Sequence, residues 1–266
     1  MIKAAVLGSP IAHSLSPKIH SHAYDLLGLN SSYSAIEVNE NSFSDFYLDA
    51  TSKESDKNWS GFSLTMPLKE IVLQFCENVD SVTESINSGN TLYKSDGTWK
   101  VSSTDYLAFR NLLAVSKESK VAIIGGGGTA RAAIGALNSK VKEVDVFLRS
   151  DSRMSALSKA APKLLIHKRD LAHPLDGYDL IIQTTPAGSF DDYVVNTRRA
   201  SGVLLEAIYK PWPTQLVKHF EELGGRVISG KELLVEQALF QIEIFSGVKF
   251  SFSEMRSALL SLIASD

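Results

Sequence analysis

The sequence predicts an α/β protein built from two domains. From residue 121 onward, apolar β-prone runs alternate with helical patterns, which is typical of a parallel sheet covered by helices. That region opens with V-A-I-I-G-G-G-G-T-A-R-A-A at 121–133, where a buried strand breaks at glycine and restarts as a helix. The first hundred residues also contain strands, but these end in a predicted hairpin, so a second α/β domain of another kind is expected.

In the first hundred residues, strands are expected where β-prone residues alternate or cluster, and helices where apolar residues recur every three or four positions. The predicted strands are 4–7, 33–38, 62–65, 91–94 and 98–102, with Ser95-Asp96-Gly97 as the hairpin turn. The predicted helices are one from Ser16, with Pro17 in its first turn, to Gly28, a short one at 43–48, and one after Pro67 that carries Ile71, Val72 and Phe75. Residues 51–60 are expected to form a polar connection.

In the rest of the chain, Asp105 stands where the N-cap of a helix with Leu107, Phe109, Leu112 and Leu113 is expected. The predicted strands are then 121–124, 143–148, 164–167, 180–183, 203–207 and 226–229. Helices are expected to begin at Thr129 and Ser152 and to cover 231–245 and 253–263. Because the last two helices can return to the first domain, we expect one domain from 1–105 with 231–266, a second from 106–230, and a cleft between them.

Composition limits the classes of protein that this chain can be. At 266 residues, it can bury a core without disulfide bonds, and its single cysteine, Cys76, favours a reducing compartment. A formal net charge of −3 gives no bias toward nucleic acid or anionic membranes. No apolar run approaches the roughly 18 residues of a membrane span, and the N-terminal run is too short for a secretory signal. We therefore expect a cytoplasmic protein. We also expect a monomer or homodimer and no metal site, although the sequence does not visibly encode the oligomeric state.

The glycine-rich turn suggests a dinucleotide site, because Gly125, Gly127 and Ala130 fit the G-x-G-x-x-G/A pattern whose N–H groups can meet a phosphate. A second interpretation stays open at this point, since any tight turn between strand and helix uses glycine for positive φ angles. After the next strand, NAD sites usually carry Asp or Glu, whereas this chain has Arg149 and Arg153, which would attract a 2′-phosphate unless both are only surface charges. The pattern favours NADP(H). The residues expected to hold it are Gly125, Gly126, Gly127, Gly128, Thr129, Ala130, Arg149, Ser150, Arg153 and Thr184.

Several further segments form a more specific pattern. They are G-S-P-I-A-H-S-L-S-P at 8–17, S-L-T-M-P-L-K at 63–69, N-T-L at 90–92, T-D at 104–105, Y-K-P-W-P-T at 209–214 and L-V-E-Q-A at 234–238. In order and spacing, over nearly the whole chain, these segments resemble the shikimate dehydrogenase family. The resemblance implies an N-terminal α/β substrate domain beside a Rossmann-like NADP-binding domain. It also implies reversible NADPH-dependent reduction of 3-dehydroshikimate to shikimate, a step of chorismate and aromatic amino acid biosynthesis.

The resemblance also implies residue roles. Reducing a ketone requires a proton for the developing alkoxide, and the implied donor is Lys69, with Asp105 holding a substrate hydroxyl and orienting the ammonium. A lysine with the usual pKa of about 10.4 is a ready acid at neutral pH. Ser14 and Ser16 would bind the substrate carboxylate at the mouth of a helix, where the dipole favours an anion. The full set of implied substrate-binding residues is Ser14, Ser16, Ser63, Thr65, Asn90, Tyr209 and Gln237.

Simpler interpretations of the same residues remain at this stage. Lys69 could be a solvated lysine, Asp105 and Ser16 could be only N-caps, and Gln237 with Gln241 could form an exposed polar stripe. The chain also departs from the usual family pattern at five positions, which are Ser63, Ser103, Tyr106, Leu148 and Gln183.

Two other functions are therefore kept open. One is a relative that accepts quinate or uses NAD, although Arg149 argues against NAD. The other is a nucleotide-sensing regulatory protein without turnover, against which Lys69 and Asp105 argue.

Overall fold

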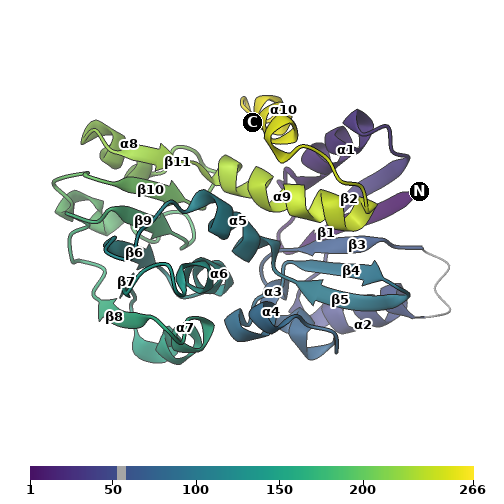
Figure 1. Cartoon of the computed structure of the whole chain (residues 1–266), viewed down its shortest axis with the longest axis horizontal. Coiled ribbons are helices and arrows are strands. Elements are labelled where there is room, and N and C mark those ends of the chain that lie inside the picture. Colours follow the sequence, from purple (N-terminus) through teal and green to yellow (C-terminus); the bar gives the residue numbers. More distant parts are fainter. Residues whose placement is uncertain (53–57) are drawn as a thin grey trace. The chain divides into compact units, whose positions relative to one another are not determined.

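The structure is a computed structural model that describes residues 1–52 and 58–266, so the middle of the polar connection expected at 51–60 lies outside the described residues. The chain divides into two compact units. Unit 1 comprises Met1–Thr104 and Val235–Asp266, and unit 2 comprises Asp105–Leu234. The chain passes from unit 1 to unit 2 within helix α5 (Thr104–Leu112) and returns within helix α9 (Gly230–Ser246) (Figure 1).

Unit 1 contains a mixed five-stranded sheet of order β2-β1-β3-β4-β5. Its strands are β1 (Ile2–Gly8), β2 (Ser31–Glu37), β3 (Gly61–Leu64), β4 (Thr91–Ser95) and β5 (Thr98–Ser102). Strand β1 pairs in parallel with β2 and β3, whereas β4 is antiparallel to both β3 and β5. Because β4 runs opposite to β3, the beginning of β4 lies beside the carboxyl end of β3.

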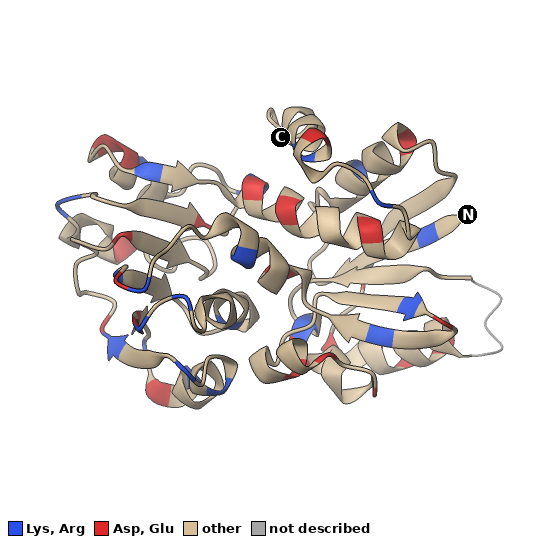
Figure 2. Cartoon of the chain, in the orientation of Figure 1, with Lys and Arg blue, Asp and Glu red and all other residues tan. Residues whose placement is uncertain are grey.

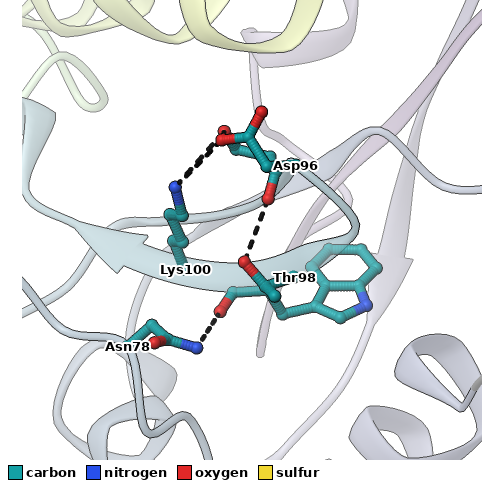
Figure 3. A network of polar contacts seen from close by, with 6 residues as sticks. Asn78, Asp96, Thr98 and Lys100 are labelled. Carbon is teal, nitrogen blue, oxygen red and sulfur yellow. Dashed lines mark hydrogen bonds and ion pairs between the residues drawn. The ribbon is translucent and has the colours of Figure 1, made fainter.

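The hairpin predicted between β4 and β5 is confirmed. Asp96 and Gly97 both have positive φ angles, of 52° and 75°, which explains why Asp-Gly occupies this turn. The Thr98 hydroxyl donates to the Ser95 carbonyl at 3.0 Å, and Lys100 Nζ lies 3.5 Å from Asp96 (Figure 3). The Asn78 amide donates to the Trp99 carbonyl at 3.1 Å and so ties the hairpin to the preceding segment.

Unit 1 contains the predicted helices, with different bounds, and one further helix, α4. They are α1 (Ser16–Leu26), α2 (Glu40–Thr51), α3 (Leu68–Ile71) followed by a 3₁₀ turn (Val72–Gln74), α4 (Ser81–Ile86) and α10 (Phe252–Leu262). Helix α2 begins earlier than predicted because Asn39 and Ser42 form a reciprocal capping box. Helix α4 was not predicted, although Asp80 marks its start by accepting hydrogen bonds from two backbone N–H groups of its first turn.

Unit 2 contains a six-stranded sheet of order β11-β10-β9-β6-β7-β8, in which every pair of neighbours is parallel. This confirms the parallel sheet predicted from the alternation of strands and helices. Its strands are β6 (Val121–Ile124), β7 (Glu143–Phe147), β8 (Leu165–Arg169), β9 (Leu180–Gln183), β10 (Val203–Glu206) and β11 (Arg226–Ile228). Its other elements are α6 (Gly128–Leu137), α7 (Met154–Ala160), α8 (Gln215–Glu222) and the 3₁₀ turns Asp151–Arg153 and Asp191–Asn196.

Both faces of the unit 2 sheet are covered. Ala122 and Ile124 of β6 belong to a buried cluster with Leu216 and Phe220 of α8. Because side chains alternate along a strand, Ile123 points to the opposite face, where it is also fully buried. Helix α8, which covers one face, was not predicted, although Thr214 caps it by accepting from the backbone of Val217.

Charged residues of both signs are interspersed along the helices and strands of each unit (Figure 2). Within the residues that the structure describes, no helix is long and apolar enough to span a membrane.

Candidate active site

The candidate site of unit 1 begins where the parallel strands β1 and β3 end side by side. Leu7 pairs with Leu64, and the loops that follow are joined by backbone bonds from Thr65 to Leu7 at 2.9 Å and from Ser9 to Met66 at 3.0 Å. A side chain at Gly8 would collide with Thr65 and the Met66 carbonyl, so glycine is required for this approach. The sequence motifs at 8–17 and 63–69 therefore meet at the carboxyl ends of β1 and β3.

Ser14 and Ser16 lie together at the mouth of α1. The Ser14 hydroxyl accepts from the Ser16 backbone N–H at 3.3 Å, and Ser16 is buried as the first residue of the helix. The interpretation of Ser16 as an N-cap is wrong, because the capping position is Leu15, whose backbone is already helical, and no side chain caps it. Two hydroxyls thus lie beside the first-turn N–H groups, an environment that favours an anion.

The backbone of Lys69 is bonded to the residue that precedes Asn90. Lys69 is the second residue of α3, and its carbonyl accepts from the N–H of Gly89 at 2.8 Å. Gly89 directly precedes Asn90, which leads into β4. The short helix that carries the lysine is thereby joined to the segment that leads into β4.

Asn90 is 2% exposed and connects three elements. Its Oδ1 accepts from the backbone N–H of Thr104 at 2.7 Å, and its Nδ2 donates to Thr104 Oγ1 at 2.9 Å and to Gln237 Oε1 at 3.2 Å. The side chain therefore satisfies the N–H group at the start of α5, and the expectation that Asp105 is the N-cap is wrong. Asp105 instead lies one residue inside α5 and is buried, adjacent to the residue that Asn90 holds.

The remaining predicted residues of unit 1 have different environments. Thr65 is half-buried in the loop that follows the carboxyl end of β3. Ser63 is buried within β3, where its hydroxyl accepts from Tyr33 at 2.6 Å and donates to Gln241 at 2.7 Å. The interpretation of Gln237 and Gln241 as an exposed polar stripe is wrong, because they are 8% and 1% exposed.

In unit 2, the glycine-rich turn lies at the carboxyl end of β6. Gly125 has φ of +110°, and a Cβ added to it would lie 2.5 Å from Thr184 Oγ1. A Cβ at Gly126 would lie 2.8 Å from Cβ of Arg153. Gly127 is extended and precedes α6, which begins at Gly128. The structure thus brings the predicted glycines, Thr184 and Arg153 together, in a turn where Gly125 has a backbone conformation that favours glycine.

Two further features of the turn concern charge. Arg149 and Ser150 follow β7 and are exposed. Strand β7 pairs with β6, and the Gly125 N–H donates to the Phe147 carbonyl at 3.1 Å, so these two residues follow the strand beside the turn. Arg131 is fully buried in α6, and its Nη1 donates to the Gly126 carbonyl at 3.3 Å. The sequence interpretation did not single out Arg131, although an arginine inside the small-residue run T-A-R-A-A-I-G is a visible signal.

Tyr209 belongs to the segment after β10 in unit 2, and this segment is fixed at both ends by Glu206. One oxygen of that fully buried carboxyl accepts from the Ile208 backbone at 3.1 Å, and the other accepts from the Thr214 hydroxyl at 2.9 Å. Burial raises the pKa of Glu206 to about 7, assisted by the charge of Asp191. The role predicted for Tyr209 at the substrate stays a prediction.

The residues of unit 2 fit a phosphorylated dinucleotide. Any side chain at Gly125 would collide with Thr184, so the turn is kept open by glycine. The first N–H groups of α6 follow the turn directly and can donate to a phosphate, and arginines lie beside it. Among the described residues, no group of three His, Cys, Asp or Glu is placed to hold a metal ion. A glycine-rich turn between a parallel strand and a helix, with arginines beside it, is typical of NADP-dependent dehydrogenases.

Comparisons with known proteins define the family. The model of the shikimate dehydrogenase substrate binding domain matches residues 6–92. The shikimate dehydrogenase (NADP(+)) of Staphylococcus epidermidis is 30% identical over 271 residues, which cover 97% of this chain and 96% of that protein. Among solved structures, the shikimate dehydrogenase of Mycobacterium tuberculosis has a TM-score of 0.85 at 31% identity and covers 98% of this chain and 100% of its own.

A second solved structure, from Thermus thermophilus in complex with NADP(H) and shikimate, has a TM-score of 0.85 at 25% identity over 99% of this chain and 100% of that chain. The chain belongs to the shikimate dehydrogenase family. This confirms the resemblance found in the sequence.

Proposed function

We propose that this chain is an NADP-dependent shikimate dehydrogenase, which reversibly reduces 3-dehydroshikimate to shikimate in chorismate and aromatic amino acid biosynthesis. The observation that supports the proposal is the backbone bond from the Gly89 N–H to the Lys69 carbonyl at 2.8 Å, because it joins the turn that carries Lys69 to the segment that leads into Asn90. A lysine can donate a proton, and an asparagine suits a hydroxylated ring. The relatives in Staphylococcus epidermidis and Thermus thermophilus support the choice of substrate and cofactor.

In this proposal unit 2 holds the cofactor, which supplies the hydride when bound. The turn of Gly125, Gly126, Gly127 and Gly128 and the first turn of α6, with Thr129 and Ala130, would hold the pyrophosphate. Arg149, Ser150 and Arg153 would hold the 2′-phosphate, since a guanidinium forms bidentate, charge-assisted hydrogen bonds with phosphate. Thr184, which lies against Gly125, would border the same cradle.

Unit 1 supplies the groups that bind and protonate the substrate. Ser14 and Ser16 bind the carboxylate, while Thr65, Asn90 and Gln237 bind ring hydroxyls, and Tyr209 of unit 2 adds a phenolic hydroxyl. As a hydride reaches the carbonyl carbon, the Lys69 ammonium donates its proton to the oxygen that becomes the hydroxyl, and the resulting amine regains a proton from water. In the oxidation direction the neutral amine accepts that proton, and Asp105, the first residue of unit 2, orients the lysine in both directions.

The proposal is tested by a matrix of four assays, shikimate or quinate with NADP⁺ or NAD⁺, followed by the nicotinamide absorbance. We expect the highest kcat/KM for shikimate with NADP⁺. Highest efficiency with quinate and NAD⁺ would favour the quinate-accepting relative instead. No absorbance change in any combination would contradict both enzyme functions and leave the regulatory one.

We also propose that the protein acts in the cytoplasm as a monomer or homodimer. Cys76, a buried free cysteine, supports the reducing compartment. Light scattering on the purified chain measures the assembly directly, and a trimer or larger would contradict it.

A further inference from the structure

A continuous series of buried hydrogen bonds runs beneath the candidate site of unit 1. It starts at Tyr33 on β2, passes through Ser63 on β3 and Gln241 on α9, and ends at Asn90. All four side chains are at most 8% exposed. The series therefore joins two strands and the returning helix to the residue that fixes the start of α5.

The direction of each bond follows from a backbone group. The Gln241 amide lies 3.0 Å from the Asn90 carbonyl, and only its Nε2 can donate to a carbonyl oxygen. Its Oε1 must then face Ser63, at 2.7 Å, so the Ser63 hydroxyl donates its only hydrogen to Gln241. The Tyr33 hydroxyl, 2.6 Å away, must in turn donate to Ser63.

The series continues on the other side of Gln241. Its Nε2 also donates to Thr91 Oγ1 at 2.9 Å, and the Thr91 hydroxyl donates to Asn90 Oδ1 at 3.1 Å. That same oxygen accepts the Thr104 backbone N–H at 2.7 Å. Gln241 therefore holds the backbone carbonyl of Asn90, while Thr91 and Thr104 orient the side-chain amide of Asn90.

The surroundings keep Tyr33 in the donor role. Its ring is stacked on the fully buried His20 ring, with centroids 4.1 Å apart and planes inclined by 16°. Burial raises the pKa of Tyr33, so its hydroxyl stays protonated at any working pH. The ring position is set by packing against His20, and the hydroxyl can point at Ser63 without further cost in side-chain entropy.

We infer that Ser63 is a positioning residue that acts on substrate binding through Gln241 and Asn90, and that Tyr33 is the residue that orients Ser63. A serine hydroxyl has one hydrogen to donate, and Gln241 uses it, so Ser63 cannot donate to a substrate hydroxyl. This inference rests on the proposed function, and it replaces the role of direct substrate ligand expected for Ser63.

The first test is the variant Ser63→Ala. It removes the hydrogen bond from Ser63 to Gln241 Oε1 and the one from the Tyr33 hydroxyl to Ser63. We expect the KM for shikimate to rise about tenfold, since a broken buried hydrogen bond carries a cost of that order. The kcat should stay within about twofold, and the KM for NADP⁺ should not change, because no cofactor residue lies in the series. The matched control is Ser88→Ala, since Ser88 is 1% exposed and its hydroxyl has no hydrogen-bond partner among the described residues.

The second test is a double-mutant cycle with Tyr33→Phe, which keeps the ring and removes only the hydroxyl. Alone it should raise the KM for shikimate about threefold, because Ser63 still donates to Gln241. In the Ser63→Ala background it should have almost no further effect, whereas independent effects would multiply to about thirtyfold. Shikimate affinity measured by calorimetry on the same four proteins should show the same non-additivity.

The outcomes separate the inference from the proposed function. Wild-type protein that does not oxidise shikimate would contradict the function and the inference with it. Active wild type with an unchanged KM in Ser63→Ala, even with a lower thermal midpoint, would overturn the inference alone, since Ser63 would then be merely structural. Multiplicative effects of Tyr33→Phe and Ser63→Ala would also overturn it, because Ser63 would then act without Tyr33.

Discussion

Replacing Glu206 by Gln should make the stability of the protein less dependent on pH between about pH 5 and pH 8. Glu206 is fully buried at the end of β10, and burial raises its pKa from 4.5 to about 7. Glutamine has the shape of the protonated acid, so its oxygen can accept from Ile208 and its Nε2 can donate to the Thr214 hydroxyl. The exchange removes the ionisation while it keeps the packing.

The size and sign follow from linkage. Between pH 4.5 and 7 the folded state binds more protons at Glu206 than the unfolded state does, so stability falls as pH rises through this range. Each pKa unit corresponds to about 1.36 kcal/mol, which gives about 3 kcal/mol at high pH. Integrated between pH 5 and pH 8, the contribution of Glu206 to the free energy of unfolding changes by about 2.5 kcal/mol. That is a large part of the 5–15 kcal/mol typical of a folded protein.

The assay is urea unfolding of wild type and Glu206→Gln at pH 5, 6.5 and 8. The free energy of unfolding of the variant minus that of wild type should increase with pH by about 2.5 kcal/mol. Other titrating groups contribute equally to both proteins and cancel in the difference. Glu222→Gln, the same exchange at an exposed position of α8, controls for the loss of a carboxylate. A difference that stays constant with pH would refute the argument.

Three further predictions concern activity. Lys69→Met should lower kcat by about 10²–10⁴, which corresponds to roughly 3–5 kcal/mol of barrier, with a smaller effect on substrate binding. An unchanged kcat would rule out the proton-transfer role of Lys69. Lys94→Met, at an exposed position of β4, is the control. Arg149→Ala should raise the KM for NADP⁺ tenfold or more while that for NAD⁺ changes little, because only NADP⁺ has a 2′-phosphate, and equal shifts would contradict the assignment. Arg131→Met should raise the KM for both cofactors alike, and selectivity for one of them would show that Arg131 does not act on the shared pyrophosphate.

Much of the fold could be predicted because local patterns agree with it. The alternation in unit 2 predicts β6 to the residue, and the Asp-Gly turn predicts the hairpin of unit 1. The failures are short or capped elements. Helix α8 has only eight residues, and its buried Leu216, Val217 and Phe220 do show a helical spacing that the sequence interpretation passed over. The start of α2 depends on the capping pair Asn39 and Ser42 rather than on apolar spacing.

In the site, residue types and loops could be predicted, but hydrogen-bond partners could not. The start of α5 shows why. The acidic residue in its first turn suggests an N-cap, yet the helix N–H is satisfied by Asn90, fourteen positions earlier and on another element. Ser63 fails in the same way, because its partners come from β2 and α9, 30 and 178 positions away. Such pairings depend on tertiary packing, which no local pattern contains.

The prediction for Arg131 is that this buried residue acts on cofactor binding through the backbone of the turn. Its guanidinium holds the carbonyl of Gly126 on the buried side of the turn. In a trans peptide the C=O and the following N–H point in opposite directions, so the N–H of Gly127 is directed away from Arg131. This orientation turns the donor outward at the start of α6, where its field adds to that of the arginine. Because the effect concerns the backbone of the turn, removing Arg131 should raise the KM for NADP⁺ and for NAD⁺ equally. Removing Arg149 should instead raise mainly the KM for NADP⁺, which alone has a 2′-phosphate.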